Sequence, residues 1–197
     1  MFNIPVILLK NLVILPNQEI KLELNNVISD KAINEAEYNF KGEILVIAPI
    51  DALEEDPSVD DKIDNYGVIE VKLRGLKRVA VNKYYQEVNN DILYSEVMYI
   101  DLPSLNVEEE NAILKKLVEV LKKYINISKS ISNDILNFVS NNKDLNKITD
   151  AITSFLPFNT SKKLEYMQEI NPIKRAKSLI KDMNEEIKSV EIDNEIE

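Results

Sequence analysis

The spacing of apolar residues changes near residue 103, from every second residue to every third or fourth. Before that point, residues 19–24 alternate apolar and charged side chains, which is typical of a half-buried antiparallel strand. Residues 4–9 and 43–48 are short apolar runs, and we expect them to form buried strands. One short helix is predicted between them at about residues 30–39, with a serine as its N-cap.

A glycine divides the next alternating stretch. Residues 68–73 alternate up to Gly75, and the pattern resumes at Val79 and Val81, so we expect a bulge or a corner at the glycine. Residues 92–100 carry apolar side chains on both faces, which is typical of a central strand. The first half of the chain is therefore predicted to consist mainly of short strands.

The second half has the spacing of helices. Asn106 is a good N-cap followed by three glutamates, and Lys122 and Lys123 stand near the predicted end, so both ends match the helix dipole. The apolar stripe of this helix consists of Ile113, Leu117, Leu121 and Tyr124. Shorter helices are expected in three further ranges, residues 132–139, 144–156 and 161–170.

The last helix is predicted to begin at Pro172, because Asn171 supplies a cap and proline suits the first turn. Its apolar residues are spaced 3-4-3-4-3, at Ile173, Ala176, Ile180, Met183, Ile187 and Val190. This spacing is that of a coiled-coil seam, but it is as typical of a helix docked into an ordinary bundle. No glycine cap follows, so we expect a fragment whose last helix continues.

Composition excludes several kinds of chemistry. The chain has no Cys and no His, which rules out thiol nucleophiles, imidazole bases and the usual zinc sites. None of its 3 glycines precedes a lysine, so it has no Walker-type phosphate loop. A net charge of -10 disfavours binding to phosphate backbones. The first residues lack the charged region of a signal peptide, and we expect a soluble cytoplasmic protein.

The remaining candidates for chemistry each have a plainer interpretation. Neighbours such as Ser128-Lys129, Ser161-Lys162 and Lys177-Ser178 do not face each other on a helix. Acidic clusters such as Asp60-Asp61 could hold a cation, but they are also typical of solvated loops. A basic stretch could contact nucleic acid, although we favour partners for the surplus carboxylates; it comprises Lys72, Arg74, Lys77, Arg78 and Lys83. Nearby tyrosines are expected in the core or at its rim, namely Tyr84, Tyr85, Tyr94 and Tyr99.

The order of these features is similar to that of one family, the N-terminal domain of Lon, the bacterial ATP-dependent serine protease. Residues 4–16, IPVILLKNLVILP, resemble its first strand and loop, with Asn17 where a glycine is usual. Residues 73–79, LRGLKRV, resemble its "VEGLxRV" strand. Further matches are its short helix (29–36), a loop (57–61) and its later helices (150–164 and 171–186). One departure is that only residues 62–67 separate Asp61 from Val68, where the family has an additional strand.

The resemblance implies an α+β fold, with a PUA-like antiparallel β-barrel over residues 1–102 and an α-helical bundle over 103–197 that ends in a long helix. It implies recognition of unfolded or damaged protein substrates and support of a hexamer in the full-length protein. It implies no catalytic, cofactor-binding or metal-binding residue in this chain. ATP and magnesium would bind to downstream domains, which would also carry the Ser-Lys peptidase. Neither a membrane nor nucleic acid is expected as a partner.

Candidate substrate contacts are apolar residues in predicted turns, because adaptable apolar surface suits many substrates. They are Val27 and Ile28, between a strand and a helix, and Leu12, Val13 and Ile14, in the loop after the first strand. Two other functions stay open. The chain could be a stand-alone Lon-domain binding module or adaptor, or an RNA-binding protein of the PUA-like type.

Overall fold

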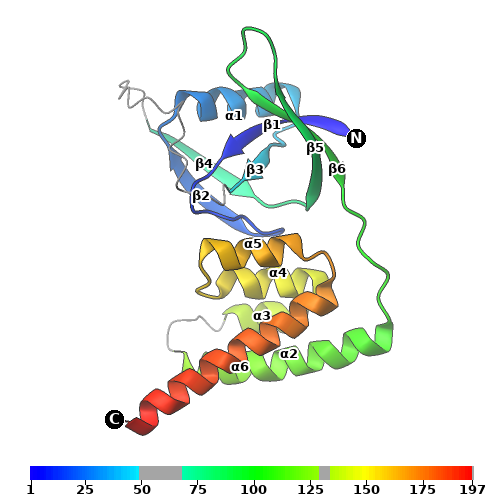
Figure 1. The fold of residues 1–197 in the computed structure, drawn as a ribbon, viewed down its shortest axis with the longest axis vertical. Coiled ribbons are helices and arrows are strands. Elements are labelled where there is room, and N and C mark those ends of the chain that lie inside the picture. Colours follow the sequence, from blue (N-terminus) through cyan, green and yellow to red (C-terminus); the bar gives the residue numbers. More distant parts are fainter. Residues whose placement is uncertain (49–67, 129–133, 197) are drawn as a thin grey trace. The chain divides into compact units, whose positions relative to one another are not determined.

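A computed structural model of the chain describes residues 1–48, 68–128 and 134–196 (Figure 1). The chain divides into two compact units, one of Met1–Ile14 and Gln18–Ile100, the other of Leu15–Asn17 and Asp101–Glu197. Strands and one helix make up the first unit, and helices make up the second. The fold is therefore α+β as expected, with a sheet region followed by a helical region that ends in a long C-terminal helix.

The described part of the sheet unit has two sheets. Its strands are β1 (Phe2–Leu8), β2 (Glu19–Leu24), β3 (Leu45–Ile47), β4 (Ile69–Arg74), β5 (Val79–Gln86) and β6 (Leu93–Tyr99). One sheet has the order β3-β1-β6-β5, and β2 pairs with β4 in the other. The β1–β3 pair is parallel, unlike the antiparallel arrangement expected throughout. It differs because β2 and helix α1 (Val27–Asn39) form the crossover that parallel neighbours need.

Strand β1 changes partner along its length. Residues 2–5 pair with β6, and residues 6–8 pair with β3. Pro5, which has no N–H to donate, lies where the pairing passes from one neighbour to the other. Strand β6 lies between β1 and β5, which confirms the prediction of a central strand over residues 92–100.

Gly75 lies at a corner between the two sheets. Strand β4, before it, pairs with β2, and strand β5, after it, pairs with β6. The Gly75 N–H donates to the carbonyl oxygen of Gln18 at 2.9 Å, next to the end of the β2–β4 ladder. The register shift lies further along, in β5 between Val81 and Lys83. The glycine thus marks a corner, and the bulge is a separate feature of β5.

Helix α1 begins earlier than predicted, because Asn26 rather than Ser29 is the N-cap. The Oδ1 atom of Asn26 accepts hydrogen bonds from the N–H groups of Ile28 at 2.8 Å and Ser29 at 3.4 Å. Helix α1 packs against β1. The core of the sheet unit consists of Ile7, Leu9, Ala32, Ile92 and Tyr94. Val27 and Ile28 therefore belong to the first turn of a helix, not to a turn before it.

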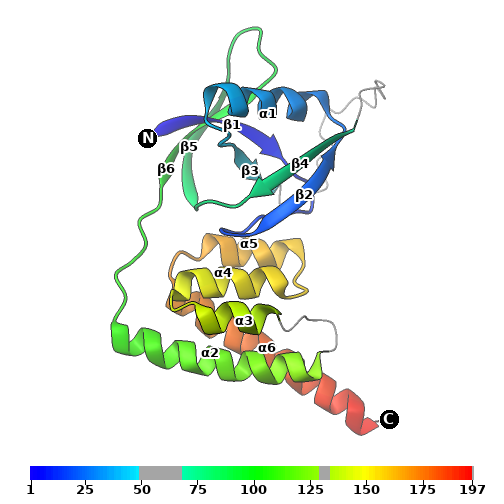
Figure 2. The ribbon, with the colours of Figure 1, turned by 180° about the vertical axis from the view of Figure 1, so that it is seen from behind.

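The helical unit contains α2 (Val107–Ile127), α3 (Asp134–Asn141), α4 (Leu145–Phe155), α5 (Thr160–Gln168) and α6 (Pro172–Ile196). Helix α2 begins after Asn106, whose Oδ1 accepts from the N–H groups of Glu108 and Glu109, both at 3.0 Å. Helix α2 continues to Ile127. Lys122 and Lys123, which were expected at the end of the helix, therefore lie before its last turn. Helix α3 lies between α2 and α4 in both views of the unit (Figures 1 and 2).

The apolar face of helix α6 packs against other helices of the same unit. It packs against α2 and α4. Its residues in the core are Ile173, Ala176, Leu179, Met183 and Ile187. Most of the predicted seam is thus buried within the chain, which favours the bundle interpretation over a coiled coil for this part of the helix.

The core of the helical unit also holds a buried ion pair. Arg175 of α6 and Asp150 of α4 are both buried, and the Arg175 Nε lies 3.7 Å from a carboxylate oxygen of Asp150. Arg175 also donates to the Thr149 hydroxyl at 3.2 Å and to the Asn146 side chain. Its third donor reaches the carbonyl oxygen of Glu169 at 2.6 Å. A buried charge is tolerated only where it is partnered. Arg175 can therefore pack between α6 and α4 only while these contacts are kept.

Candidate functional site

The lysines of two Ser-Lys candidates are held by carboxylates. The Lys162 Nζ lies 3.1 Å from Asp182, and the Lys177 Nζ lies 3.1 Å from Glu109. The Ser128-Lys129 pair extends outside the described residues, and so do Asp60-Asp61 and the shortened connection before Val68. In the described part of the chain, no group of His, Cys, Asp or Glu could hold a metal ion. No helix within residues 1–48, 68–128 and 134–196 is long and apolar enough to cross a membrane.

The basic stretch mostly meets carboxylates and an aromatic ring. The Lys72 Nζ lies 2.8 Å from Glu19, and its hydrogen bond and charge lower the pKa of that carboxyl. The Lys83 Nζ lies 3.6 Å from Glu96. The Lys77 Nζ lies 4.8 Å from the centre of the Tyr99 ring. These contacts support the interpretation that the cations partner the protein's own side chains.

The five predicted substrate contacts do not share one exposed surface. Ile28 is 41% exposed at the start of α1, and Val27 is half-buried. Leu12 and Ile14 pack against the core of the sheet unit, and Val13 is only 5% exposed. Of the five, Ile28 alone offers a large apolar surface without rearrangement. Their role in substrate contact stays a prediction.

The sheet carries a different apolar surface, which sequence reasoning did not identify. Residues that are directly paired across strands point to the same face of a sheet. Tyr99 is paired with Val79, and Val97 is paired with Phe2 on one side and Val81 on the other. Tyr84 is paired with Ser95, which shares this face with Val97. We call the surface formed by Phe2, Val79, Val81, Tyr84 and Tyr99 the Tyr99 patch.

The Tyr99 patch is accessible and has a cation at its margin. Tyr99 is 51% exposed, Tyr84 is 49% exposed and Val81 is 36% exposed, around a fully buried Val97. The Phe2 and Tyr99 ring centres are 4.9 Å apart, and Lys77 lies over the Tyr99 ring. A tyrosine hydroxyl is neutral at physiological pH, and partial burial raises the pKa of Tyr84 further. The patch therefore offers neutral apolar and aromatic surface to a partner.

Sequence alone gave only part of this signal. The sequence predicts Tyr84 and Tyr99 in the core or at its rim, and both lie at the rim. The face of Tyr84 could not be assigned from sequence, because the register shift between Val81 and Lys83 changes the alternation along β5. Phe2 joins the patch only through pairing with a strand near residue 97.

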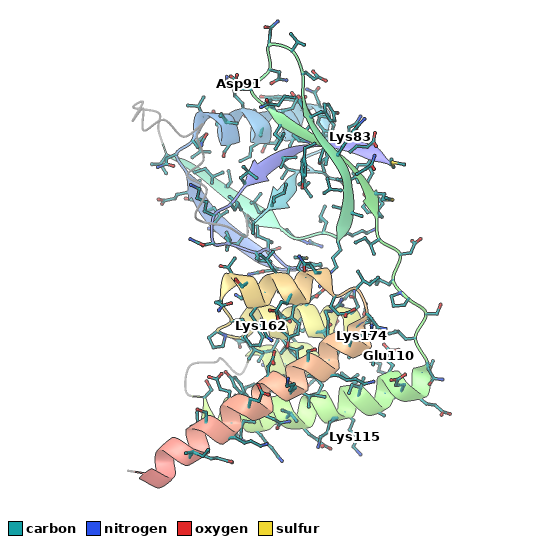
Figure 3. The ribbon with its side chains drawn as sticks, viewed as in Figure 1. Lys83, Asp91, Glu110, Lys115, Lys162 and Lys174 are labelled. Atoms are coloured by element: carbon teal, nitrogen blue, oxygen red, sulfur yellow. The ribbon has the colours of Figure 1, made fainter. Side chains whose placement is uncertain are left out.

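The helical unit has a polar groove between α5 and α6, with a volume of about 570 Å³. Its lining includes Lys162, which Figure 3 labels on α5, together with Asp182 and Phe158. The Tyr166 hydroxyl donates to Asp182 at 2.6 Å, and burial and this carboxylate both raise the pKa of the tyrosine. Burial lowers the pKa of Lys162, but the ion pairs with Asp182 and Glu165 raise it overall. Asp182 is thus already occupied by two partners from this chain.

Two solved structures with a similar fold are titled as Lon N-terminal domains. The structure titled "N terminal domain of Mycobacterium avium complex Lon protease" matches with a TM-score of 0.72 and 17% sequence identity, over 93% of this chain and 98% of that one. A Lon N-terminal domain protein from Xanthomonas campestris matches with a TM-score of 0.58 and 18% identity, over 91% and 98% of the two chains. The fold is therefore that of a Lon N-domain.

Curated relatives match the chain over almost its entire length. The Lon protease of Buchnera aphidicola subsp. Schizaphis graminum is 27% identical over 98% of this chain, and that of Brevibacillus choshinensis is 23% identical over 98%. In both cases the match covers 26% of the relative, so the chain spans about a quarter of these proteins.

The family described as the ATP-dependent protease La (LON) substrate-binding domain matches residues 3–185. The chain belongs to this family, which confirms the resemblance inferred from its motifs. The Lon N-domain is present, and the chain contains none of the catalytic domains.

Proposed function

We propose that this chain is the non-catalytic N-terminal domain of an ATP-dependent Lon protease and that it binds unfolded or damaged proteins through the Tyr99 patch. The observation that carries the proposal is the exposed face around Tyr99, Tyr84 and Val81 in a chain of the Lon substrate-binding family. Unfolded proteins expose apolar side chains in many different sequences. A surface rich in apolar contacts and poor in directional ones binds such ligands without selecting one sequence.

The remaining parts of the proposal concern the domains and the assembly of the full-length protein. Its downstream domains bind ATP and magnesium and carry the Ser-Lys peptidase, and the N-domain supports a hexameric assembly in the cytoplasm. The chain matches 26% of the relatives' length, so a full-length protein of their size has room for both modules. The N-domain then performs recognition, and hydrolysis takes place elsewhere.

The direct test is binding of a permanently unfolded, fluorescently labelled reporter protein to this chain, measured by anisotropy. The double variant Tyr84→Ser/Tyr99→Ser should lower the affinity about thirtyfold, because it removes two exposed aromatic contacts that contribute about 1 kcal/mol each. Tyr38→Ser is the matched control, since Tyr38 is 84% exposed on α1 and lies outside the patch. Equal affinity of the double variant and the control would remove the patch from the proposal.

A second candidate is a stand-alone Lon-domain binding module. A match to 26% of the relatives' length fits this module as well as it fits a part of a longer protein. The mass of the native protein from its source cells, compared with the 22.6 kDa of this chain, separates the two. A much larger mass supports the protease, and an equal mass supports the module.

A further inference from the structure

We propose that the outer edge of β5 binds an extended segment of the substrate as an additional strand. The inference rests on the proposed function and deepens it, because it specifies the conformation in which a substrate is held. The occupant is a short extended polypeptide with apolar side chains at alternate positions and without a cluster of basic residues. Backbone hydrogen bonds give such a complex affinity that does not depend on sequence.

The first observation is that β5 ends its sheet. In the described residues, β5 pairs with β6 on one side and with no strand on the other. Residues 81–84 are exposed at four consecutive positions, so both faces of the strand meet solvent there. Figures 1 and 2 show β5 and β6 as a long curved hairpin. An edge of this kind presents backbone N–H and C=O groups that another strand can pair with.

The second observation is the length of regular strand available. The register shift between Val81 and Lys83 divides β5, and a bulge of this kind interrupts pairing. After it, residues 83–86 stay in continuous register with β6. Every second residue of this part directs both backbone groups outward. The edge therefore accommodates a segment of about four residues, beside the bulge rather than across it.

The third observation is the arrangement of side chains on this part of the edge. Tyr84 belongs to the Tyr99 patch, and Tyr85 points to the opposite face, where it stacks on Tyr94 with ring centres 5.6 Å apart. A strand added beside β5 places alternate side chains next to Tyr84. Neighbouring apolar side chains on paired strands stabilise the pairing. The edge and the Tyr99 patch thus form one continuous surface for an extended chain.

The fourth observation concerns Lys83, the only charged residue of β5. A lysine on an edge strand commonly opposes pairing with another chain. Here its Nζ is drawn back across the sheet, 3.6 Å from Glu96 and 6.0 Å from the centre of the Tyr85 ring. Figure 3 labels Lys83 on this strand. The lysine therefore leaves the edge open to a neutral or acidic segment.

The length of the edge argues against a second copy of this chain as the occupant. Two β5 edges paired over residues 83–86 would join the copies through about four residues each, whereas a stable interface takes about 20 to 30 residues a side. An extended substrate segment needs no further matching surface, so we favour it over a dimer.

The test uses three labelled hexapeptides of one sequence, with Tyr or Val alternating with Thr and one Glu. The first is unmodified, and the others carry N-methyl groups on the amides of odd or of even residues. N-methylation removes the N–H donors along one edge of an extended peptide. We expect the unmodified peptide to bind, one methylated form to bind at least tenfold more weakly, and the other to retain most of the affinity. Amide hydrogen exchange within residues 83–86 should slow when the unmodified peptide is bound.

Each contrary result has a definite meaning. Equal affinities of the three peptides, or exchange that slows elsewhere and not in residues 83–86, would overturn strand addition. Failure of the hexapeptide to bind would also overturn it if the unfolded reporter protein binds, and the proposed function would then stand. Failure of the reporter itself would reject the proposed function. A dimer that dissociates when the peptide is added, seen by sedimentation, would show that a second copy normally occupies the edge and would overturn our choice of occupant.

Discussion

The aromatic rings of Phe2 and Tyr99 lie 4.9 Å apart, although nearly the whole sheet unit separates them in sequence. Phe2 begins β1, Tyr99 ends β6, and the antiparallel pairing of the two strands brings these ends together. The contact is tilted, with 40° between the rings, a geometry that aromatic pairs favour over face-to-face stacking. Because Tyr99 stays half-exposed, the pair is available to a partner and is not a core contact.

Replacing Tyr99 should affect binding more than folding. The variant Tyr99→Ser removes a half-exposed ring, so we expect the free energy of unfolding to fall by only about 1 kcal/mol. Its affinity for the unfolded reporter protein should fall several-fold. Urea denaturation measures the first quantity, and anisotropy measures the second. A loss of affinity no larger than that of Tyr38→Ser would contradict the role of the patch.

The substrate contacts predicted from sequence separate into two kinds. Val13→Ser places a hydroxyl at a buried position and should lower the free energy of unfolding by about 2–3 kcal/mol. Ile28→Ser changes an exposed residue and should lower it by less than about 1 kcal/mol. Thermal unfolding of both variants tests the difference. If Ile28→Ser also weakens reporter binding at unchanged stability, Ile28 belongs to the binding surface.

The buried pair of Arg175 and Asp150 should be intolerant of losing one member. Asp150→Leu leaves the guanidinium without its carboxylate, and we expect a loss of about 3–5 kcal/mol. The double variant Asp150→Leu/Arg175→Met removes both charges, so much of the stability should return. Urea denaturation of the wild type, both single variants and the double variant gives the coupling energy. A double variant as unstable as the sum of the single ones would show that the pair is not coupled.

Tyr166 should contribute to a loss of stability in alkaline solution. Burial and Asp182 raise its pKa in the folded chain above the ordinary value near 10. The folded state therefore holds this proton more tightly than the unfolded state. The resulting stability is fully present below about pH 10 and is lost as the pH rises further, because the unfolded chain ionises first.

The variant Tyr166→Phe isolates this contribution. It should be less stable than the wild type by about 1–2 kcal/mol at pH 7, because the hydrogen bond to Asp182 is lost. Above about pH 10 the difference should shrink. Tyr38→Phe serves as the control, since Tyr38 is exposed on α1. A constant difference between wild type and Tyr166→Phe from pH 7 to pH 11 would contradict the raised pKa of Tyr166.

Local sequence signals predicted most of the helices and strands. The caps at Asn106, Asp144 and Asn171 accept hydrogen bonds from N–H groups two residues on, as such residues do at helix starts. At α1 the predicted cap was wrong, because Asn26 and not Ser29 accepts the hydrogen bonds of the first N–H groups. The family could also be inferred from the sequence, because its motifs keep their order along the chain.

The sequence by itself determined where the elements lie and which of their residues are apolar, because caps, turns and periodicity depend on neighbours within about four positions. Only the tertiary structure decided which faces meet and which remain exposed. Parallel pairing of β1 with β3, burial of Arg175 and assembly of the Tyr99 patch all join residues far apart in sequence. Strand register sets these contacts, and a single register shift in β5 changes which of its side chains share a face with Val97.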